Sequence, residues 1–196
     1  MIKKYLLIPI IIFITICGSE DADVSENNET VQNTINSSVE EPTTDLITAV
    51  IDNDLESVNQ HIAYGSDLNV QDGVFSNTPL NFASIYGLTD IANALVDAGA
   101  DLNLINSDNF TPLCNAAAWG HTSVVTILLD AGADLSAKCF ETQIGVSVTL
   151  SIAIGAPYSD YIKSLYVDHG EKYNIPYDET KIIDGREKVI ELLRNR

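Results

Sequence analysis

Histidine and cysteine are the residues of this sequence whose side chains would most readily bind zinc, together with carboxylates. A structural zinc site needs four such ligands, usually at short spacings along the chain. The three histidines, His61, His121 and His169, lie far apart, and neither His61 nor His169 has a cysteine or a carboxylate at ligand spacing. We therefore expect no metal site and no other cofactor.

The sequence also lacks the residue arrangements that enzymes use. It has no Ser-His-Asp constellation, no glycine-rich loop that would cradle a phosphate, and no motif of paired carboxylates. Its 10 basic and 28 acidic residues give a formal charge of −18, which repels nucleic acids and anionic lipid headgroups. We therefore expect a protein that is not an enzyme and that binds no nucleic acid.

Cys17 ends a segment with the features of an export signal. Lys3 and Lys4 make the start of the chain positive, and an apolar run from Tyr5 to Ile16 follows. A run of about a dozen residues is too short to cross about 30 Å of hydrocarbon as a helix. We predict that residues 1–17 are a signal peptide and favour this over an anchor that stays in the membrane.

The residues that lead up to Cys17, Ile-Thr-Ile-Cys, resemble the lipobox of bacterial lipoproteins. This resemblance implies that Cys17 is lipidated, so that the protein is anchored in the periplasm or at the outer membrane of a bacterium. Ile16 departs from the pattern, because the family places Gly, Ala or Ser before the cysteine. The alternative is cleavage nearby by the ordinary signal peptidase, which would give a secreted protein. A lipid on Cys17 is the one membrane contact that we expect.

Residues 18–44 differ in composition from the rest of the chain. They are Ser, Thr, Asn, Glu and Asp with scattered valines, and the apolar residues show no periodicity. Such a stretch cannot bury enough apolar surface to offset the entropy lost when it becomes ordered. We predict a disordered linker that holds a folded domain away from a membrane.

Motifs in the following part of the chain recur at a fixed spacing. The tripeptide Thr-Pro-Leu occurs at 78–80 and 111–113, Gly87 is followed by Gly120, and Gly99 by Gly132, each 33 residues later. Thr-Pro-Leu at this period resembles the ankyrin repeat. The resemblance implies an all-α fold, a solenoid of stacked helix-turn-helix units with degenerate capping units at its ends.

The residues of each motif suit their expected places in a helix. Thr78 and Thr111 suit the N-cap, where a hydroxyl accepts a hydrogen bond from an otherwise unpaired backbone N–H. The proline that follows each threonine suits the first helical position, where its missing N–H is not needed. Gly99 and Gly132 suit the left-handed conformation that ends a helix. We therefore expect two helices in each unit.

The degenerate units are assigned from partial matches to the same pattern. The predicted ankyrin domain covers residues 45–196 and has a cap at 45–72, repeats at 73–105 and 106–138, a degenerate repeat at 139–174 and a C-terminal helix at about 184–196.

The resemblance also implies where a partner protein would bind. Ankyrin repeats contact partners through a concave surface, from the loop before Thr-Pro-Leu and from the two residues before the helix-ending glycine. Four of the residues at these positions are aromatic, and aromatic residues dominate the binding energy of protein interfaces. The alternative is that these rings pack against neighbouring repeats. The predicted contact residues are Val74, Phe75, Asn77, Ile85, Tyr86, Ser107, Asp108, Phe110, Ala118 and Trp119.

Cys114 and Cys139 lie one repeat apart in this scheme. A disulfide between them is conceivable in an oxidising compartment. We favour two separate thiols, one of them buried.

Together these features predict a monomeric protein–protein interaction module that is exported to the bacterial envelope. The acidic surface favours a basic partner for rapid association, whereas the aromatic side chains favour affinity. The alternative function is a secreted effector or toxin-neutralising protein that acts outside the cell.

Overall fold

The computed structural model of this protein describes residues 40–136, 139, 167–168, 170–175 and 177–196. Within these residues every regular element is a helix, so the prediction of an all-α fold is confirmed. The predicted signal peptide, Cys17 and most of the degenerate repeat lie outside the described residues. The helices with described bounds are α1 (Leu46–Ile51), α2 (Leu55–Tyr64), α3 (Pro79–Tyr86), α4 (Thr89–Asp97), α5 (Pro112–Ala118), α6 (Thr122–Asp130) and α9 (Glu179–Arg194), and residues 167–168 and 170–173 are also helical.

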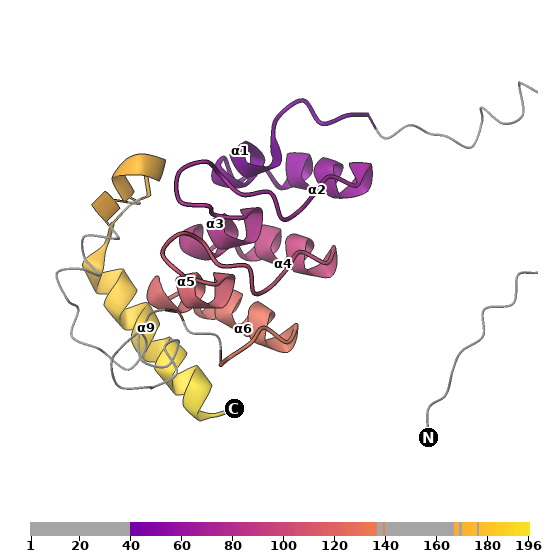
Figure 1. The fold of residues 1–196 in the computed structure, drawn as a ribbon. Helices are drawn as coiled ribbons and strands as arrows, with labels where there is room; N and C mark the ends of the chain where they lie inside the picture. The colour runs from indigo at the N-terminus through magenta and orange to yellow at the C-terminus, as the bar shows by residue number, and fades with distance from the viewer. Residues whose placement is uncertain (1–39, 137–138, 140–166, 169, 176) are drawn as a thin grey trace, which may run out of the picture. The chain divides into compact units, whose positions relative to one another are not determined.

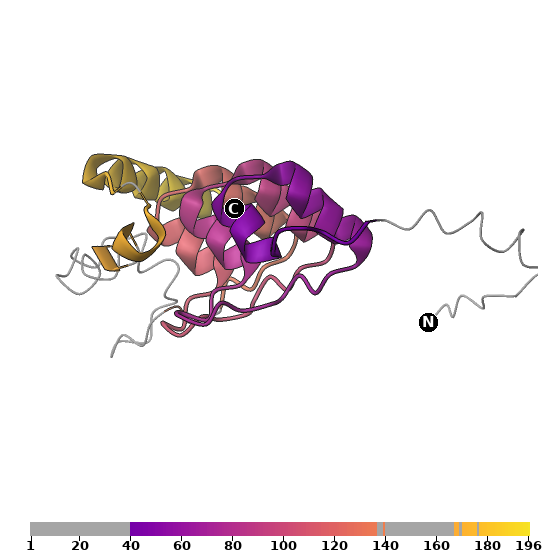
Figure 2. The ribbon, with the colours of Figure 1, turned by 90° about the horizontal axis from the view of Figure 1, so that it is seen from above.

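The first six of these helices form three stacked pairs. Figure 1 shows α1, α3 and α5 in one column, while α2, α4 and α6 form a second column beside it. Each helix contacts its partner in the pair and the equivalent helix of the next pair, so α3 packs against both α1 and α5. The loops that join successive pairs all project from the same side of the stack (Figure 2).

The helix ends form as the Thr-Pro-Leu motifs predict. The Thr78 hydroxyl accepts a hydrogen bond from the backbone N–H of Asn81 at 3.1 Å, and Thr111 accepts one from Cys114 at 3.2 Å. A proline occupies the first turn of each helix. Gly99 and Gly132 have φ angles of 88° and 90°, which a β-carbon would disfavour. Local chemistry therefore sets where each pair begins and ends.

The first pair uses aspartates in place of threonine caps. Asp45 accepts a hydrogen bond from the backbone of Thr48 at 2.9 Å, and Asp54 accepts one from Ser57 at 3.1 Å. Hydrogen bonds from the side chain and backbone of Thr48 lower the pKa of Asp45, and those of Ser57 lower that of Asp54. The unit without Thr-Pro-Leu therefore still has capped helices.

The residues just before α1 do not match the predicted linker. The linker was predicted to extend to Thr44, but the carbonyl of Thr44 is 2.6 Å from the Nε2 atom of His61 on α2. Gln60 also donates a hydrogen bond to the carbonyl of Glu40 at 3.4 Å. Residues 40–44 therefore lie against α2, because α2 supplies polar side chains that bond to their backbone.

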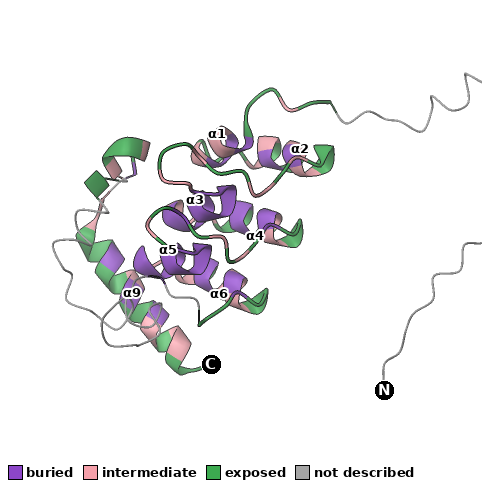
Figure 3. Cartoon of the chain, viewed as in Figure 1, coloured by how far each residue is buried: buried purple, intermediate pink, exposed green. Residues whose placement is uncertain are grey.

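The apolar core runs through the middle of the stack. Figure 3 shows that α3 and α5 are the most completely buried helices, whereas the far ends of α2, α4 and α6 are exposed. Leu80, Phe82 and Leu113 are less than 2% exposed, and so are Leu95 and Leu128 on the second helices. A single pair cannot bury its own apolar face, so each unit needs its neighbours for stability.

Asparagines join neighbouring units through hydrogen bonds that the sequence analysis did not anticipate. Asn115 on α5 donates from its side chain to that of Asn81 on α3 at 2.8 Å. The Asn69 side chain accepts a hydrogen bond from the backbone N–H of Asp101 at 2.9 Å, and the same bond recurs one unit later. Since the repeat period places these residues side by side, polar groups hold the stack in register as well as apolar ones.

His121 also joins two units. Its Nε2 atom lies 2.9 Å from the carbonyl of Ile85, and its ring covers Gly87, where a β-carbon would overlap it. Burial lowers the pKa of His121, although the bond to Ile85 acts in the opposite direction. His121 is therefore a neutral structural residue at neutral pH, and it donates from Nε2.

The C-terminal helix α9 begins earlier than the sequence analysis predicted. It spans Glu179–Arg194 rather than about 184–196, because Asp178 caps it by accepting a hydrogen bond from the backbone of Lys181 at 3.2 Å. The helix packs beside α5 and α6 (Figure 1), and Arg196 bonds to Asp130 at the end of α6 at 2.7 Å. No helix in the described part of the chain is long and apolar enough to cross a membrane.

Two glycines allow α9 to approach the repeats closely. A β-carbon built on Gly120 would lie 2.8 Å from the α-carbon of Gly185, and one built on Gly185 would overlap the carbonyl oxygen of Gly120. Glycine inside a helix normally costs about 1 kcal/mol relative to alanine. The close contact is the physical reason for Gly185 in the middle of α9.

We expect Gly185→Ala to destabilise the protein although alanine is the better helix former. The added methyl group would overlap the Gly120 carbonyl and push α9 off the repeats. The free energy of unfolding in urea should fall by about 2 kcal/mol. Glu187→Ala, at an exposed position of the same helix, is the control and should change it by less than about 0.5 kcal/mol. A more stable Gly185→Ala variant would contradict this contact.

Candidate protein-binding site

The site begins with the loop that precedes α3. We call residues 65–78 and 98–111, which join successive helix pairs, the finger loops. In the first finger loop, Asp72 accepts hydrogen bonds from the backbone of Asn77 at 2.6 Å, Val74 at 3.0 Å and Phe75 at 3.3 Å. One carboxylate therefore closes the loop and holds Phe75 in place.

The second finger loop closes in the same way with an amide. Asn106 accepts hydrogen bonds from the backbone of Asp108 at 3.0 Å and of Phe110 at 2.9 Å. Its side-chain nitrogen donates to the side chain of Asn77 in the unit before, at 2.9 Å. Asp72 and Asn106 thus occupy the same structural position, and either side chain can close a finger loop.

Phe75, Phe82, Tyr86 and Asp72 surround the ring of Tyr173, which comes from the C-terminal part of the chain. We call these four residues the tyrosine site. The Tyr173 ring meets Phe82 edge to face at 4.9 Å between centroids, and Phe75 at 5.9 Å. Such edge-to-face pairs are a favoured geometry for aromatic rings.

Hydrogen bonds fix both ends of Tyr173 in the tyrosine site. Its hydroxyl donates to the Asp72 carboxylate at 2.6 Å. The Tyr86 hydroxyl donates to the backbone carbonyl of Tyr173 at 2.7 Å. A carboxylate acceptor makes the first bond stronger than one between neutral groups. The site therefore recognises a phenol hydroxyl and a main-chain carbonyl together.

The environment keeps both tyrosine hydroxyls protonated. Burial raises the pKa of Tyr86 from its ordinary value of 10.0 to about 12, and the charge of Asp52 adds to the effect. Burial also raises the pKa of Tyr173, as do the hydrogen bond and the charge of Asp72. Because folding raises both pKa values, this contribution to stability is complete below about pH 10 and is lost as the pH rises further.

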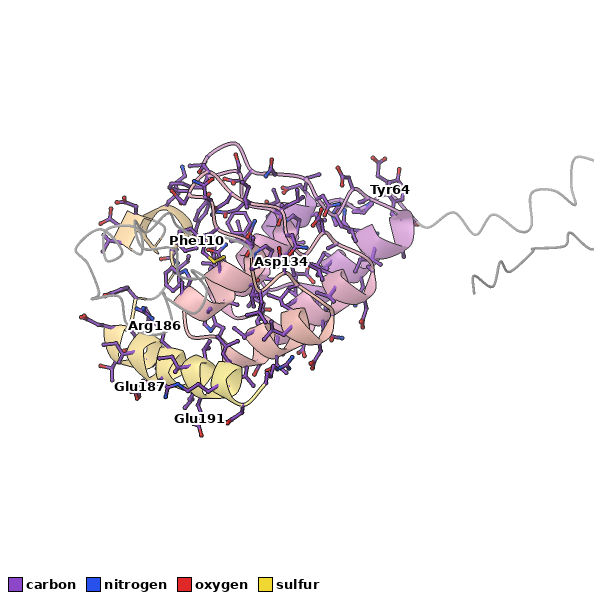
Figure 4. All side chains as sticks on the ribbon, turned by 60° about the horizontal axis from the view of Figure 1, so that its bottom comes forward. Tyr64, Phe110, Asp134, Arg186, Glu187 and Glu191 are labelled. Carbon is purple, nitrogen blue, oxygen red and sulfur yellow. A yellow bond between two sulfur atoms is a disulfide. The ribbon has the colours of Figure 1, made fainter. Side chains whose placement is uncertain are left out.

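A second contact lies next to the tyrosine site. Ile175 and Ile182 belong to a buried apolar cluster with residues of α3, α5 and the second finger loop. Figure 4 shows Phe110 near the disulfide on this side of α5, and Arg186 pointing inward from α9 while Glu187 and Glu191 point outward. The other buried members of the cluster are Ile85, Phe110, Cys114, Ala118, Trp119 and Cys139.

Comparison with known protein families agrees with this geometry. Residues 46–139 match the family model described as ankyrin repeats, in three copies. These residues are therefore similar to ankyrin repeats, as the sequence analysis predicted. Ankyrin repeats are generally protein–protein interaction modules. A search of curated proteins finds no match to the chain.

The structure places the predicted contact residues of the ankyrin repeats at very different depths. Trp119 is 7% exposed and Phe110 6%, because Ile175 and Ile182 pack in the same cluster. In this structure these two rings therefore pack inside the protein, as the alternative interpretation held. The role of the predicted residues in binding a partner stays a prediction. Of the others, Val74 and Ser107 are exposed, Phe75, Tyr86 and Asp108 are half-buried, and Asn77, Ile85 and Ala118 are buried.

The prediction of two separate thiols is wrong, because Cys114 and Cys139 form a disulfide with their α-carbons 5.6 Å apart. Both cysteines are fully buried. Cys139 follows the Asp-Leu motif of its repeat at the same distance as Asp72 and Asn106 do in theirs. As Asn106 reaches back to Asn77 at the start of α3, so Cys139 reaches back to the first turn of α5. The repeat geometry therefore brings the two sulfur atoms together.

Tyr173 and Ile175 are residues that the sequence analysis missed. Tyr173 comes from the predicted degenerate repeat and Ile175 from just after it, and Tyr173 lies 101 residues from Asp72. The sequence feature that could have pointed to a buried contact here is a pair of tyrosines and an isoleucine in the otherwise largely polar stretch 170–178. In the described residues, no group of three or more His, Cys, Asp or Glu side chains could hold a metal ion.

We expect the disulfide to contribute about 3 kcal/mol to stability, because it closes a loop of about 25 residues in the unfolded chain. Reduction with dithiothreitol should lower the free energy of unfolding in urea by that amount. The Cys114→Ala, Cys139→Ala double variant is the control, because reduction should leave its stability unchanged. Equal stability of the oxidised and reduced wild-type protein would contradict this expectation.

Proposed function

We propose that this chain is a protein–protein interaction module of the bacterial envelope that binds its partner with the finger-loop side of the ankyrin repeats. The observation that carries the proposal is the exposure of apolar side chains on this side. Val74 is 51% exposed, Ile105 49% and Val70 36%, and all three lie in finger loops. These loops project together from the stack (Figure 2). Apolar side chains gathered on one side of a protein favour contact with another protein.

The charge of the finger loops favours a basic partner. Asp67 and Asp101 are exposed near the bases of successive loops, and the chain as a whole carries a formal charge of −18. Complementary charge raises the association rate and discourages wrong partners, whereas the buried apolar contacts set the affinity. We therefore propose a partner protein whose contact surface has an apolar centre surrounded by basic residues.

Export of the protein is supported by two independent features. Residues 1–17 have the charge and apolar pattern of a signal peptide, and Cys17 ends a sequence that resembles a lipobox. The disulfide between Cys114 and Cys139 suits an oxidising compartment, since disulfides rarely persist in the cytosol. We propose a lipid anchor at Cys17 that holds the repeats in the periplasm or at the outer membrane.

We expect crosslinking pull-down from the native envelope to recover a partner that depends on the finger loops. The mature protein serves as bait beside a Val74→Asp, Ile105→Asp variant, in which each charge would enter the apolar contact. Recovery should fall at least about tenfold, since each lost anchor costs more than about 1 kcal/mol. Ile183→Asp is the matched control, because Ile183 is similarly exposed, at 43%, but lies on α9. Equal recovery with the finger-loop variant would move the interface elsewhere.

We expect radiolabelled fatty acid to be incorporated into the wild-type protein and not into the Cys17→Ser variant. Only a thiol at this position can receive the lipid in lipoprotein maturation. The label is measured after immunoprecipitation, and Cys114→Ser serves as a control that should still be labelled. Recovery of the unlabelled wild-type protein from the culture medium would instead favour the secreted alternative.

A further inference from the structure

Few side chains attach the C-terminal segment, residues 170–175, to the repeats. Ile175 is 8% exposed and Tyr173 is half-buried. Glu171, Lys172 and Asn174 are all exposed. Two anchors separated by one residue therefore make the contact, and the residues around them face solvent.

The contacts of the tyrosine site are those that a peptide ligand needs. Phe75 and Phe82 contact the ring, Asp72 accepts a hydrogen bond from the hydroxyl, and Tyr86 donates one to a main-chain carbonyl. The main-chain bond is independent of sequence, whereas the ring and hydroxyl contacts select tyrosine. Main-chain bonds for affinity and side-chain pockets for specificity together are a recurring mode of peptide recognition.

The covalent connection gives Tyr173 an advantage over any separate ligand. Tyr173 is 87 residues from Tyr86 in the sequence, so it reaches the site as a tethered ligand rather than as part of the same repeat. Tethering of this kind gives an effective concentration in the millimolar range. A partner must therefore displace the chain's own tyrosine before it occupies the site.

We propose that the tyrosine site binds a segment of the partner protein that carries an unmodified tyrosine followed two residues later by an aliphatic residue, and that Tyr173 occupies this site in the free protein. The inference rests on the proposed function and names the chemistry of one of its contacts. A phosphotyrosine is excluded, because its charge of about −2 would meet the Asp72 carboxylate.

The experiment uses the full mature chain and a fluorescein-labelled peptide with the sequence of residues 168–178 as the probe. Fluorescence anisotropy measures its binding to the wild type and to Tyr173→Ala. The Tyr173→Ala variant should bind the probe at least about tenfold more tightly, because the competing tyrosine is gone. Circular dichroism with thermal unfolding checks that the variant remains folded. Tyr173→Phe, which keeps the ring but loses the bond to Asp72, gives a second folded comparison with an intermediate gain.

Asp72→Asn in the Tyr173→Ala background tests the carboxylate itself. Asn106 closes the next finger loop with an amide, so this substitution should preserve the loop and remove only the charged acceptor. Binding of the probe should weaken about tenfold, in line with the loss of a hydrogen bond to a charged group. A probe with phosphotyrosine in place of the tyrosine should show no binding, and a phenylalanine probe should bind about tenfold more weakly.

Two results would overturn the inference. One is binding of the probe to Tyr173→Ala no tighter than to the wild type, and the other is equal binding of the phosphorylated probe. Neither result affects the proposed function if the envelope pull-down still recovers a partner through Val74 and Ile105. Conversely, a pull-down without a partner would remove the proposed function even if the probe binds as expected.

Discussion

The structure depends on the packing of each helix pair against the next. The helices are short, and every residue of α3 and α5 except Tyr86 is buried between neighbours. Neither helix would be stable alone, because isolated helices of this length are marginal in water. Burial of Leu80 and Phe82 depends on the units on both sides, and the hydrogen bond between Asn81 and Asn115 requires those units to be in register.

A stack of repeats needs an end, and here the C-terminal part of the chain supplies one. The helix α9 covers α5 and α6 on one side, and the contact of Gly120 with Gly185 brings the two backbones together. The residues just before α9 extend the same covering over the aromatic side chains of α3. The C-terminal part of the chain therefore covers part of the surface that the resemblance to ankyrin repeats assigns to a partner.

Local chemistry made much of the fold predictable from the sequence. Thr78 and Thr111 mark the starts of helices, because their hydroxyls cap the first turn. Gly99 and Gly132 mark the ends of helices, because they adopt a left-handed backbone conformation. The fixed period then gives the stacking, from which the buried leucines follow. The start of α9 was predicted at about residue 184, whereas the cap at Asp178 decides it.

The candidate site was harder to predict, because its contacts are long-range. Phe75 and Tyr86 were identified from their places in the repeat, but no local pattern joins them to Tyr173, 87 or more residues away. The burial of Trp119 has the same origin, since the residues that pack with it come from the C-terminal part of the chain. The disulfide also required knowledge of which finger position faces the preceding unit.

That position has a wider consequence for how such a protein acquires new properties. Asp72, Asn106 and Cys139 lie at equivalent places in successive units. Asp72 accepts a hydrogen bond as a carboxylate, Asn106 donates one to the preceding unit, and Cys139 forms a disulfide with it. The first two each close their finger loop by accepting backbone hydrogen bonds, although the first loop is one residue longer between this position and the helix cap. Duplication of a unit therefore supplies a fresh copy of this position, at which a single substitution is enough to change how one layer is joined to the next.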